Sequence, residues 1–279
     1  MGLMLTGCAP PGPKGVRVSL GGAQIPVELV ESWLHDSKTR PFTVHQVSPV
    51  YLSQHGFQNL ARGECDLACT DRPITVRELP QFGDRPVQGR RVAFYGYALY
   101  VHPSNPLDSV FVKQLRQVFE TKIADWKELA GGQIAGLEGA IQLYGPHKST
   151  RGGSVLAPLA KIWFAGATWQ TLDTDAEIVA KVAEDPLALG FAGIGYDHDV
   201  RYLGLRMERT GAPVFPSLEE IESERYGLAK LIYVYYVDPP SPSVQAVLDY
   251  LYGPEGRAAI ESGELWAVPP DRAAVQPAS

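Results

Sequence analysis

The chain has 279 residues, of which 45% are hydrophobic and 20% are charged, with a formal net charge of −6 and a pI near 5.6. This length is enough for one large domain or two modest ones, each with its own core. No basic stripe follows any segment, so composition and charge argue against a nucleic-acid partner.

The N-terminus resembles a lipid-attachment site. Leu5-Thr6-Gly7-Cys8 is similar to the lipobox of bacterial lipoproteins, whose Cys is acylated after cleavage. A complete signal peptide has a positively charged start and an apolar stretch of about 7–15 residues, whereas only residues 1–7 precede Cys8. The match is either a truncated signal or accidental, and the Pro- and Gly-containing residues after Cys8 favour a truncated signal with a tether. We therefore expect lipid anchoring through Cys8, in the periplasm or at the cell surface.

The first elements are predicted from short apolar runs. Residues 16–20 and 65–70 read as buried strands, and residues 43–50 as an extended segment. The glycines in residues 21–24 indicate a turn that leads into a helix. Residues 53–64 are expected to form a loop followed by a helix.

Two of the cysteines lie in one predicted strand. At ~3.3 Å per residue, the Cα atoms of Cys65 and Cys69 would lie roughly 13 Å apart, which is too far for a disulfide. The C-x-x-x-C spacing without a nearby pair of histidines is also poor for zinc. We expect two buried thiols, and no metal or cofactor.

The rest of the chain alternates strands with amphipathic helices. Residues 91–101 and 231–237 are the longest β-type runs. Ser109 is expected to cap a helix whose apolar residues recur at helical spacing. Further elements are a strand over residues 141–144, a helix over 155–164, a helix from 178, a short strand within 190–197, and helices that begin at Pro242 and Pro254.

This alternation predicts an α/β fold with mainly parallel sheets. The two longest β runs are the best candidates for segments that cross between two lobes. In open α/β sheets, ligands bind at the carboxyl ends of the strands, so a cleft between two such lobes is the expected ligand site. The predicted parts are a tether (residues 1–15), a first lobe (16–96 and 233–279) and a second lobe (97–232).

The segment "YGPHKSTRGGS" carries the densest set of polar groups. Lys148-Ser149-Thr150 resembles the end of the nucleotide-binding P-loop, but His147 stands where that motif requires Gly. The loop lies between a predicted strand and a predicted helix, whose N-terminus attracts anions. Ser149 and Thr150 add hydroxyl donors, and Arg151 adds a guanidinium suited to a tetrahedral oxyanion. The alternative is an ordinary helix cap with solvated Lys and Arg.

Two other loops occupy equivalent places. "LGGAQIP" connects a predicted strand to a helix, so the backbone at Ala23 and Gln24 could bind the same ligand. "ACTDRPIT" ends a strand with Thr70 and Asp71, for which the alternative is a turn pair between Asp71 and Arg72. Three loops at strand ends favour an anion site more than any one loop does.

Several segments, in chain order, carry a resemblance to a known family. They are "LARGECDLACTDRPI", "YALYVHPSNPLDSVFVKQLRQVFETKIADWKELAGG", "STR" before a helix, "GFAGIGY", and "KLIYVYYV" with the helices after it. Their order and spacing are similar to those of the phosphate-binding proteins of bacterial phosphate ABC importers, which are two-lobed periplasmic receptors. The likeness covers most of residues 16–270.

The resemblance implies roles for single residues. Ser149 and Thr150 would donate to the anion, and Arg151 or a neighbour (His147 or Lys148) would supply charge. Ser53 in "SQHG" would replace a serine of the family's second loop. Asp71 would match the family's aspartate that accepts a proton from the ligand. Phosphate near neutral pH has such a proton and sulfate has none, so Asp71 would repel sulfate.

The resemblance also implies a monomeric receptor that delivers phosphate to an ABC permease. This sequence departs from the family where Ser149 and Thr150 are adjacent, without the usual intervening Gly, and where the first loop offers "GGAQ" in place of Ser and Thr. Another oxyanion, or a sensor or scaffold lipoprotein of the same fold, therefore stays open. We expect no enzyme, because the sequence has no G-x-S-x-G elbow and no H-E-x-x-H helix.

Overall fold

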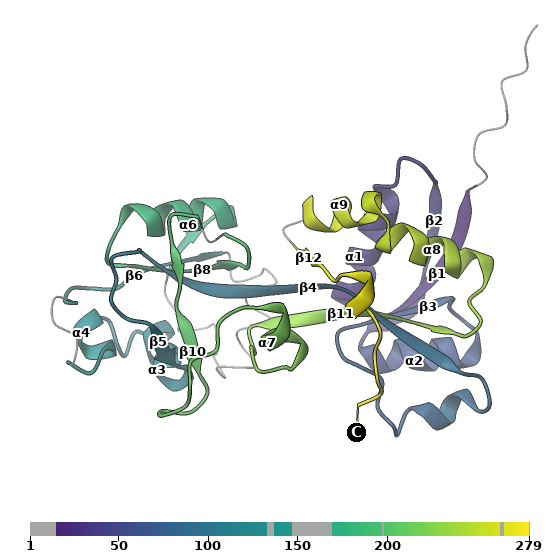
Figure 1. Cartoon of the computed structure of the whole chain (residues 1–279), viewed down its shortest axis with the longest axis horizontal. Coiled ribbons are helices and arrows are strands. Elements are labelled where there is room, and N and C mark those ends of the chain that lie inside the picture. Colours follow the sequence, from purple (N-terminus) through teal and green to yellow (C-terminus); the bar gives the residue numbers. More distant parts are fainter. Residues whose placement is uncertain (1–14, 133–136, 147–168, 197, 263–264, 279) are drawn as a thin grey trace, which may run out of the picture. The chain divides into compact units, whose positions relative to one another are not determined.

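The computed structural model describes residues 15–132, 137–146, 169–196, 198–262 and 265–278 (Figure 1). The chain divides into two compact units. Unit 1 comprises Met1–Ala93, Ile232–Gly263 and Ala267–Ser279, and unit 2 comprises Phe94–Leu231 and Glu264–Trp266. Two of the boundaries fall within long strands, β4 (Val87–Val101) and β11 (Ala229–Val237). Each unit is therefore built from segments that are far apart in the sequence.

Unit 1 contains a sheet with the strand order β2-β1-β3-β11. Its strands besides β11 are β1 (Val16–Ala23), β2 (Phe42–Tyr51) and β3 (Leu67–Thr70). β1 runs parallel to both β2 and β3, while β11 is antiparallel to β3. All four residues of β3 are buried, as expected for a central strand covered on both faces.

Helices cover both faces of this sheet. α1 (Gln24–His35) packs with α8 (Pro242–Tyr252) and α9 (Pro254–Ser262), and α2 (Ser53–Arg62) lies on the opposite face (Figure 1). Each helix buries an apolar side, with Trp33 of α1 and Phe57 of α2 almost fully inaccessible to solvent. β1 lies between β2 and β3, so the helices that follow β1 and β2 run to opposite faces of the sheet. The carboxyl ends of the strands between these two helices are therefore left uncovered by them.

The structure corrects two predictions in unit 1. Residues 21–23 do not form a turn: β1 continues to Ala23, and α1 begins at the next residue. Pairing with β3 on one side and, at Gly22 and Ala23, with β2 on the other keeps these residues in the strand, with a register irregularity between Leu20 and Gly22. The strand predicted over residues 65–70 is shorter: β3 begins at Leu67, and Asp66 just before it accepts hydrogen bonds from the backbone N–H and hydroxyl of Ser19.

Within unit 2 the strand order is β4-β8-β6-β7. β8 (Ala188–Gly193) is antiparallel to β4 and parallel to β6 (Gln142–Pro146), which is parallel to β7 (Gln170–Leu172). α6 (Asp175–Glu184) packs on β8 and β6, and a capping box at Thr174 fixes its start. The remaining elements are β5 (Ser109–Phe111), α3 (Val112–Phe119), α4 (Trp126–Leu129), β9 (Arg201–Tyr202), β10 (Gly204–Arg206), α7 (Leu218–Glu222) and β12 (Trp266–Ala267).

One prediction in unit 2 is wrong, and another lies outside the described residues. Ser109 does not cap α3: it is the first residue of β5, which pairs with β10, and Phe111 precedes the helix. The helix predicted over residues 155–164 falls in the part of the chain that is not described. The α/β fold predicted from the alternation of elements is confirmed, with antiparallel pairs at β11 and β4 added to the parallel ones.

Candidate functional site

The carboxyl ends of the parallel strands of unit 1 meet at one edge of the sheet. The register places Gly22 of β1 opposite Cys69 of β3, so these two strands end together. α1 begins directly after β1, and α2 begins two residues after β2 ends. This edge gathers the residues of unit 1 that the sequence predicts as ligand-binding: Ala23, Gln24, Ser53, Thr70 and Asp71.

The two helices begin at this edge without a side-chain cap. Ala23 before α1 and Leu52 before α2 are extended, neither caps its helix, and neither helix has an acidic residue in its first turn. By contrast, side chains of Thr174 and Ser241 cap α6 and α8. First-turn N–H groups have no partner inside a helix, and together with the helix dipole they attract anions. The starts of α1 and α2 therefore offer N–H donors to an anion.

Two glycines allow α2 to lie against the end of β1. Gly22 has a φ angle of +137°, and a Cβ atom on it would lie 2.0 Å from the carbonyl oxygen of Cys69. A Cβ atom on Gly56, in the first turn of α2, would lie 2.7 Å from the Cα atom of Gly22. Any side chain at either position would push backbone segments apart. The geometry of the edge therefore depends on both glycines.

Ser53 and Asp71 are joined by two hydrogen bonds. The hydroxyl of Ser53 donates to Oδ1 of Asp71 over 2.5 Å, and the backbone N–H of Asp71 donates to Oγ of Ser53 over 3.1 Å. Ser53 is 4% exposed, so water hardly competes for its hydroxyl. The start of α2 and the end of β3 are thus tied together, which the separation of 18 residues in the sequence did not indicate.

The side chains of Thr70 and Gln24 have other partners. Thr70 is fully buried, and its hydroxyl donates to the carbonyl oxygen of Arg72 over 3.0 Å. The amide of Gln24 is exposed and donates to Glu28 one turn further along α1. Ala23 has no polar side-chain atom. At these three positions the groups that can reach a ligand are therefore main-chain groups.

Arg72 is held by Glu78, not by Asp71 as the turn-pair alternative required. Its two terminal nitrogens lie 2.8 Å and 2.7 Å from the two carboxylate oxygens of Glu78, and its guanidinium lies over the ring of Phe57. Glu78 also accepts hydrogen bonds from the backbone N–H and hydroxyl of Thr75. The hydrogen bonds from Arg72 lower the pKa of Glu78 from 4.5 to about 2. The pair was not predicted, because its spacing of six residues follows no helix or strand period.

We expect Glu78→Gln to destabilise unit 1 at neutral pH by about 1–2 kcal/mol, because it breaks a bidentate, charge-assisted pair that is only partly exposed. Since folding lowers the pKa of Glu78, its contribution is complete above pH 4.5 and is lost as the pH falls toward 2. Urea unfolding of both proteins at pH 7 and pH 3 should show a difference that shrinks in acid.

The matched control for this prediction is Glu64→Gln. Glu64 lies 3.9 Å from Arg62 in an exposed pair of the same unit, and such pairs contribute little. An equal loss of stability in both variants, or a difference that does not change with pH, would contradict the stabilising role of Glu78.

The remaining predicted residues lie outside the described part of the chain. These are Ser149, Thr150 and Arg151, their neighbours His147 and Lys148, and the predicted lipid-attachment residue Cys8. β6 ends at Pro146, directly before residues 147–151 in the sequence.

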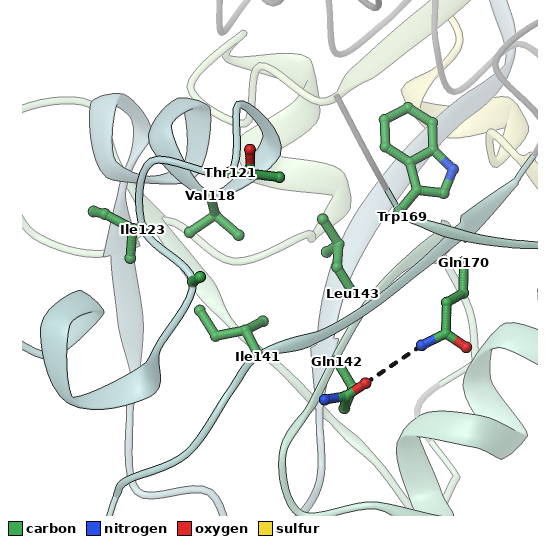
Figure 2. A pocket seen from close by; sticks show the side chains of 9 residues that line it. Val118, Thr121, Ile123, Ile141, Gln142, Leu143, Trp169 and Gln170 are labelled. Atoms are coloured by element: carbon green, nitrogen blue, oxygen red, sulfur yellow. Dashed lines mark hydrogen bonds between the residues drawn. The ribbon is translucent and has the colours of Figure 1, made fainter. Parts of the chain in front are cut away.

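Unit 2 contains a separate pocket of about 340 Å³ (Figure 2). Apolar side chains of Val118, Ile123 and Leu143 line it, and the side chains of Gln142 and Gln170 form a hydrogen bond at its edge. The pocket is lined by Gln142 and Leu143 at the start of β6, whereas Ser149 comes after the last residue of β6 in the sequence. Among the residues that the structure describes, none of those predicted as ligand-binding lines this pocket.

The described residues add three further findings. Cys65 and Cys69 are free and buried, which confirms the prediction of two buried thiols, and burial raises the pKa of the Cys65 thiol to about 12. No group of three or more His, Cys, Asp and Glu side chains gathers in a metal-binding arrangement within the described ranges. In the same part of the chain, no helix combines the length and apolarity that crossing a bilayer requires.

Comparisons with known proteins agree with this fold. The chain is 24% identical over 221 residues to Protein SphX of Synechococcus elongatus, a match that covers 75% of this chain and 65% of that relative. A possible phosphate binding protein from Planctomyces limnophilus has a similar structure, with a TM-score of 0.70 and 18% identity over 92% of this chain and 94% of its own. An ABC-type phosphate transport receptor from Vibrio cholerae is also similar, with a TM-score of 0.61. It is 17% identical in sequence, and the match covers 90% of this chain and 99% of the receptor's. These two structures confirm the fold.

The family itself is shown by a family model. The model of the PBP superfamily domain matches residues 16–255, which include most of each unit. This range contains the edge of unit 1 with Ser53 and Asp71, as well as the loop of Ser149. The resemblance predicted from segment order is thereby confirmed, and the chain belongs to the PBP superfamily.

Proposed function

We propose that the chain captures inorganic phosphate outside the cytoplasmic membrane and delivers it to an ABC importer. The observation that carries this proposal is the combination of N–H donors and one carboxylate at the same edge. The uncapped starts of α1 and α2 favour an anion, and Asp71 lies beside the first residue of α2. A carboxylate there is compatible with an anionic ligand only if that ligand can donate a proton to it.

This combination favours phosphate over sulfate. Near neutral pH phosphate retains at least one proton, which it can donate to the carboxylate of Asp71. Fully ionised sulfate would face the same carboxylate with lone pairs and negative charge only. Asp71 therefore weakens the binding of sulfate. Two of the similar structures are described as a possible phosphate binding protein and an ABC-type phosphate transport receptor, which supports the same ligand class.

We assign the binding groups as follows. Ala23, Gln24 and Thr70 contribute main-chain groups, because their side chains are apolar or already bonded within the protein. Ser149, Thr150 and Arg151 are proposed to add hydroxyl and guanidinium donors to the same ligand. We also propose that the two units are the two lobes of a solute-binding protein, joined through β4 and β11.

The cellular setting is part of the same proposal. A receptor for an ABC permease works as a monomer outside the membrane, and lipid attachment at Cys8 would keep it there. No residue is assigned a catalytic role. A sensor or scaffold of the same fold is the second candidate, and the observation in its favour is that Ala23 and Gln24 bring no hydroxyl to the first loop.

Calorimetric titration of phosphate tests the proposal. We expect binding of one phosphate per chain, in the micromolar range or tighter, that persists in excess sulfate. Absence of heat with phosphate, on protein shown to be folded by circular dichroism, would contradict the transport function and favour the scaffold. Turnover of a generic phosphate ester in the same preparation would instead support an enzyme.

A further inference from the structure

The last described segment of the chain runs beside the first half of β4. We call this segment, residues 265–278, the C-terminal strap. Its strand β12 (Trp266–Ala267) pairs with β4, and the backbone N–H of Val268 donates to the carbonyl oxygen of Val92 over 2.9 Å. The side chains of Val268 and Ala273 are buried. The strap is therefore packed into the fold and is not a loose tail.

Arg91 of β4 holds the middle of the strap. Its backbone N–H donates to the carbonyl oxygen of Ala273 over 2.7 Å. Its Nη1 donates to the carbonyl oxygens of Arg272 and Ala274 over 3.2 Å and 2.9 Å. Three consecutive carbonyl groups of the strap thus accept hydrogen bonds from one residue. An arginine is suited to this role, because its guanidinium presents several N–H donors in a rigid plane.

The end of the strap is bonded to the loop that follows β3. The backbone N–H of Ala278 donates to the carbonyl oxygen of Ile74 over 2.8 Å, and the backbone N–H of Val76 donates to the carbonyl oxygen of Ala278 over 2.9 Å. Among the described residues, these two are the only hydrogen bonds between main-chain groups that join residues 72–85 to another segment of the chain. The main chain of this loop is therefore held from outside, by the strap.

We propose that the C-terminal strap is a conformational device that holds residues 72–85 in place. Arg91 fixes the middle of the strap, and the fixed strap presents Ala278 to the loop. Because the loop begins directly after Asp71, release of the strap also loosens one side of the candidate phosphate edge. A ligand that must order a loop as it binds is bound more weakly. The hold on the loop is independent of the proposed function, whereas the effect on phosphate affinity rests on it.

Amide hydrogen exchange in the full, ligand-free chain tests the hold on the loop. In Arg91→Gln, whose shorter side chain cannot donate to both carbonyl groups, the amide of Val76 should exchange about tenfold faster than in the wild type. Arg90→Gln is the matched control, because it removes the same charge from the next residue of β4 while the Arg90 side chain bonds to Tyr236. Equal exchange of the Val76 amide in the two variants would overturn the proposal.

A second pair of variants acts at the end of the strap, away from the core of unit 1. Ala278→Pro removes the N–H that donates to Ile74. Gln276→Pro is its control, because Gln276 is exposed and its backbone N–H donates no hydrogen bond to the described main chain. The amide of Val76 should exchange faster in Ala278→Pro only. The same rate in both proline variants would overturn the hold of the strap on the loop.

Calorimetric titration of phosphate into the same two proline variants tests the link to binding. We expect phosphate affinity to fall about three- to tenfold in Ala278→Pro and to stay as in the wild type in Gln276→Pro. Equal affinities in both variants would overturn the link between the strap and the phosphate edge. If the wild type binds no phosphate, the proposed function fails, whereas the exchange of the Val76 amide still decides whether the strap holds the loop.

Discussion

Replacing Asp71 with Asn is expected to weaken phosphate binding by about 10- to 150-fold, which corresponds to the roughly 1.5–3 kcal/mol of a hydrogen bond to a charged group. The carboxylate accepts the ligand's proton, and an amide oxygen is a weaker acceptor. Sulfate affinity should stay the same or increase, because the substitution removes a negative charge and adds an N–H donor. The ratio of the two affinities, measured by calorimetry, is the quantity to compare.

Asp84→Asn is the control for this prediction. Asp84 is exposed in the same unit, so its replacement changes the net charge equally without touching the edge of the sheet. Suppose the ratio of phosphate to sulfate affinity is the same in Asp71→Asn and in Asp84→Asn. The carboxylate of Asp71 then does not accept the ligand's proton and is not the source of selectivity.

Gly22→Ala is expected to cause the largest loss of stability, about 2–5 kcal/mol, from a left-handed backbone angle and from overpacking. The new Cβ atom would lie 2.0 Å from the carbonyl oxygen of Cys69, an atom of the neighbouring strand that cannot simply rotate away. The strands must separate, which moves the start of α2 with Ser53. Urea unfolding should show the loss, and any folded fraction should bind phosphate weakly.

Gly63→Ala separates the two causes. Gly63 ends α2 with a φ angle of +73°, but a Cβ atom on it would meet nothing within 4 Å. Its replacement should therefore lower the free energy of unfolding only by the cost of a left-handed backbone angle, about 1–2 kcal/mol. Phosphate affinity should stay unchanged. Equal destabilisation by both substitutions would mean that the close approach of β1 and β3 is not what Gly22 provides.

Much of the fold could be predicted from local signals. The helix at Pro242 begins at its Ser-Pro start and ends before Gly253, because capping, proline and glycine preferences and apolar periodicity all agree there. The long strands β4 and β11 were equally clear from their apolar and aromatic runs. Prediction succeeded where the local preference and the tertiary environment ask for the same conformation.

The errors arose where tertiary pairing overrides local preference. The glycines at residues 21 and 22 indicate a turn, yet pairing with the neighbouring strands keeps them within β1. Ser109 looks like a helix cap, yet it pairs with β10 as part of β5. A short window of sequence does not determine which strands pair with each other. Local turn and cap signals therefore give wrong predictions at such positions.

The candidate site follows the same division. Asp71 and Ser53 could be found, because each ends or begins a predictable element and the family resemblance points to both. Their mutual hydrogen bonds could not, since these depend on α2 packing against β1 and β3 through Gly22 and Gly56. The pairing of Arg72 with Glu78 was missed for a similar reason, because it depends on the path of a loop.

Mapping phosphate onto the protein by amide chemical shifts in NMR would locate the binding site itself. With increasing phosphate, the signals of the first turns of α1 and α2 and of Asp71 should shift and saturate together, while signals of the Gln142–Gln170 pocket stay in place. Saturable shifts confined to that pocket, or no shifts in the folded protein, would contradict the assignment of the edge of unit 1 as a phosphate site.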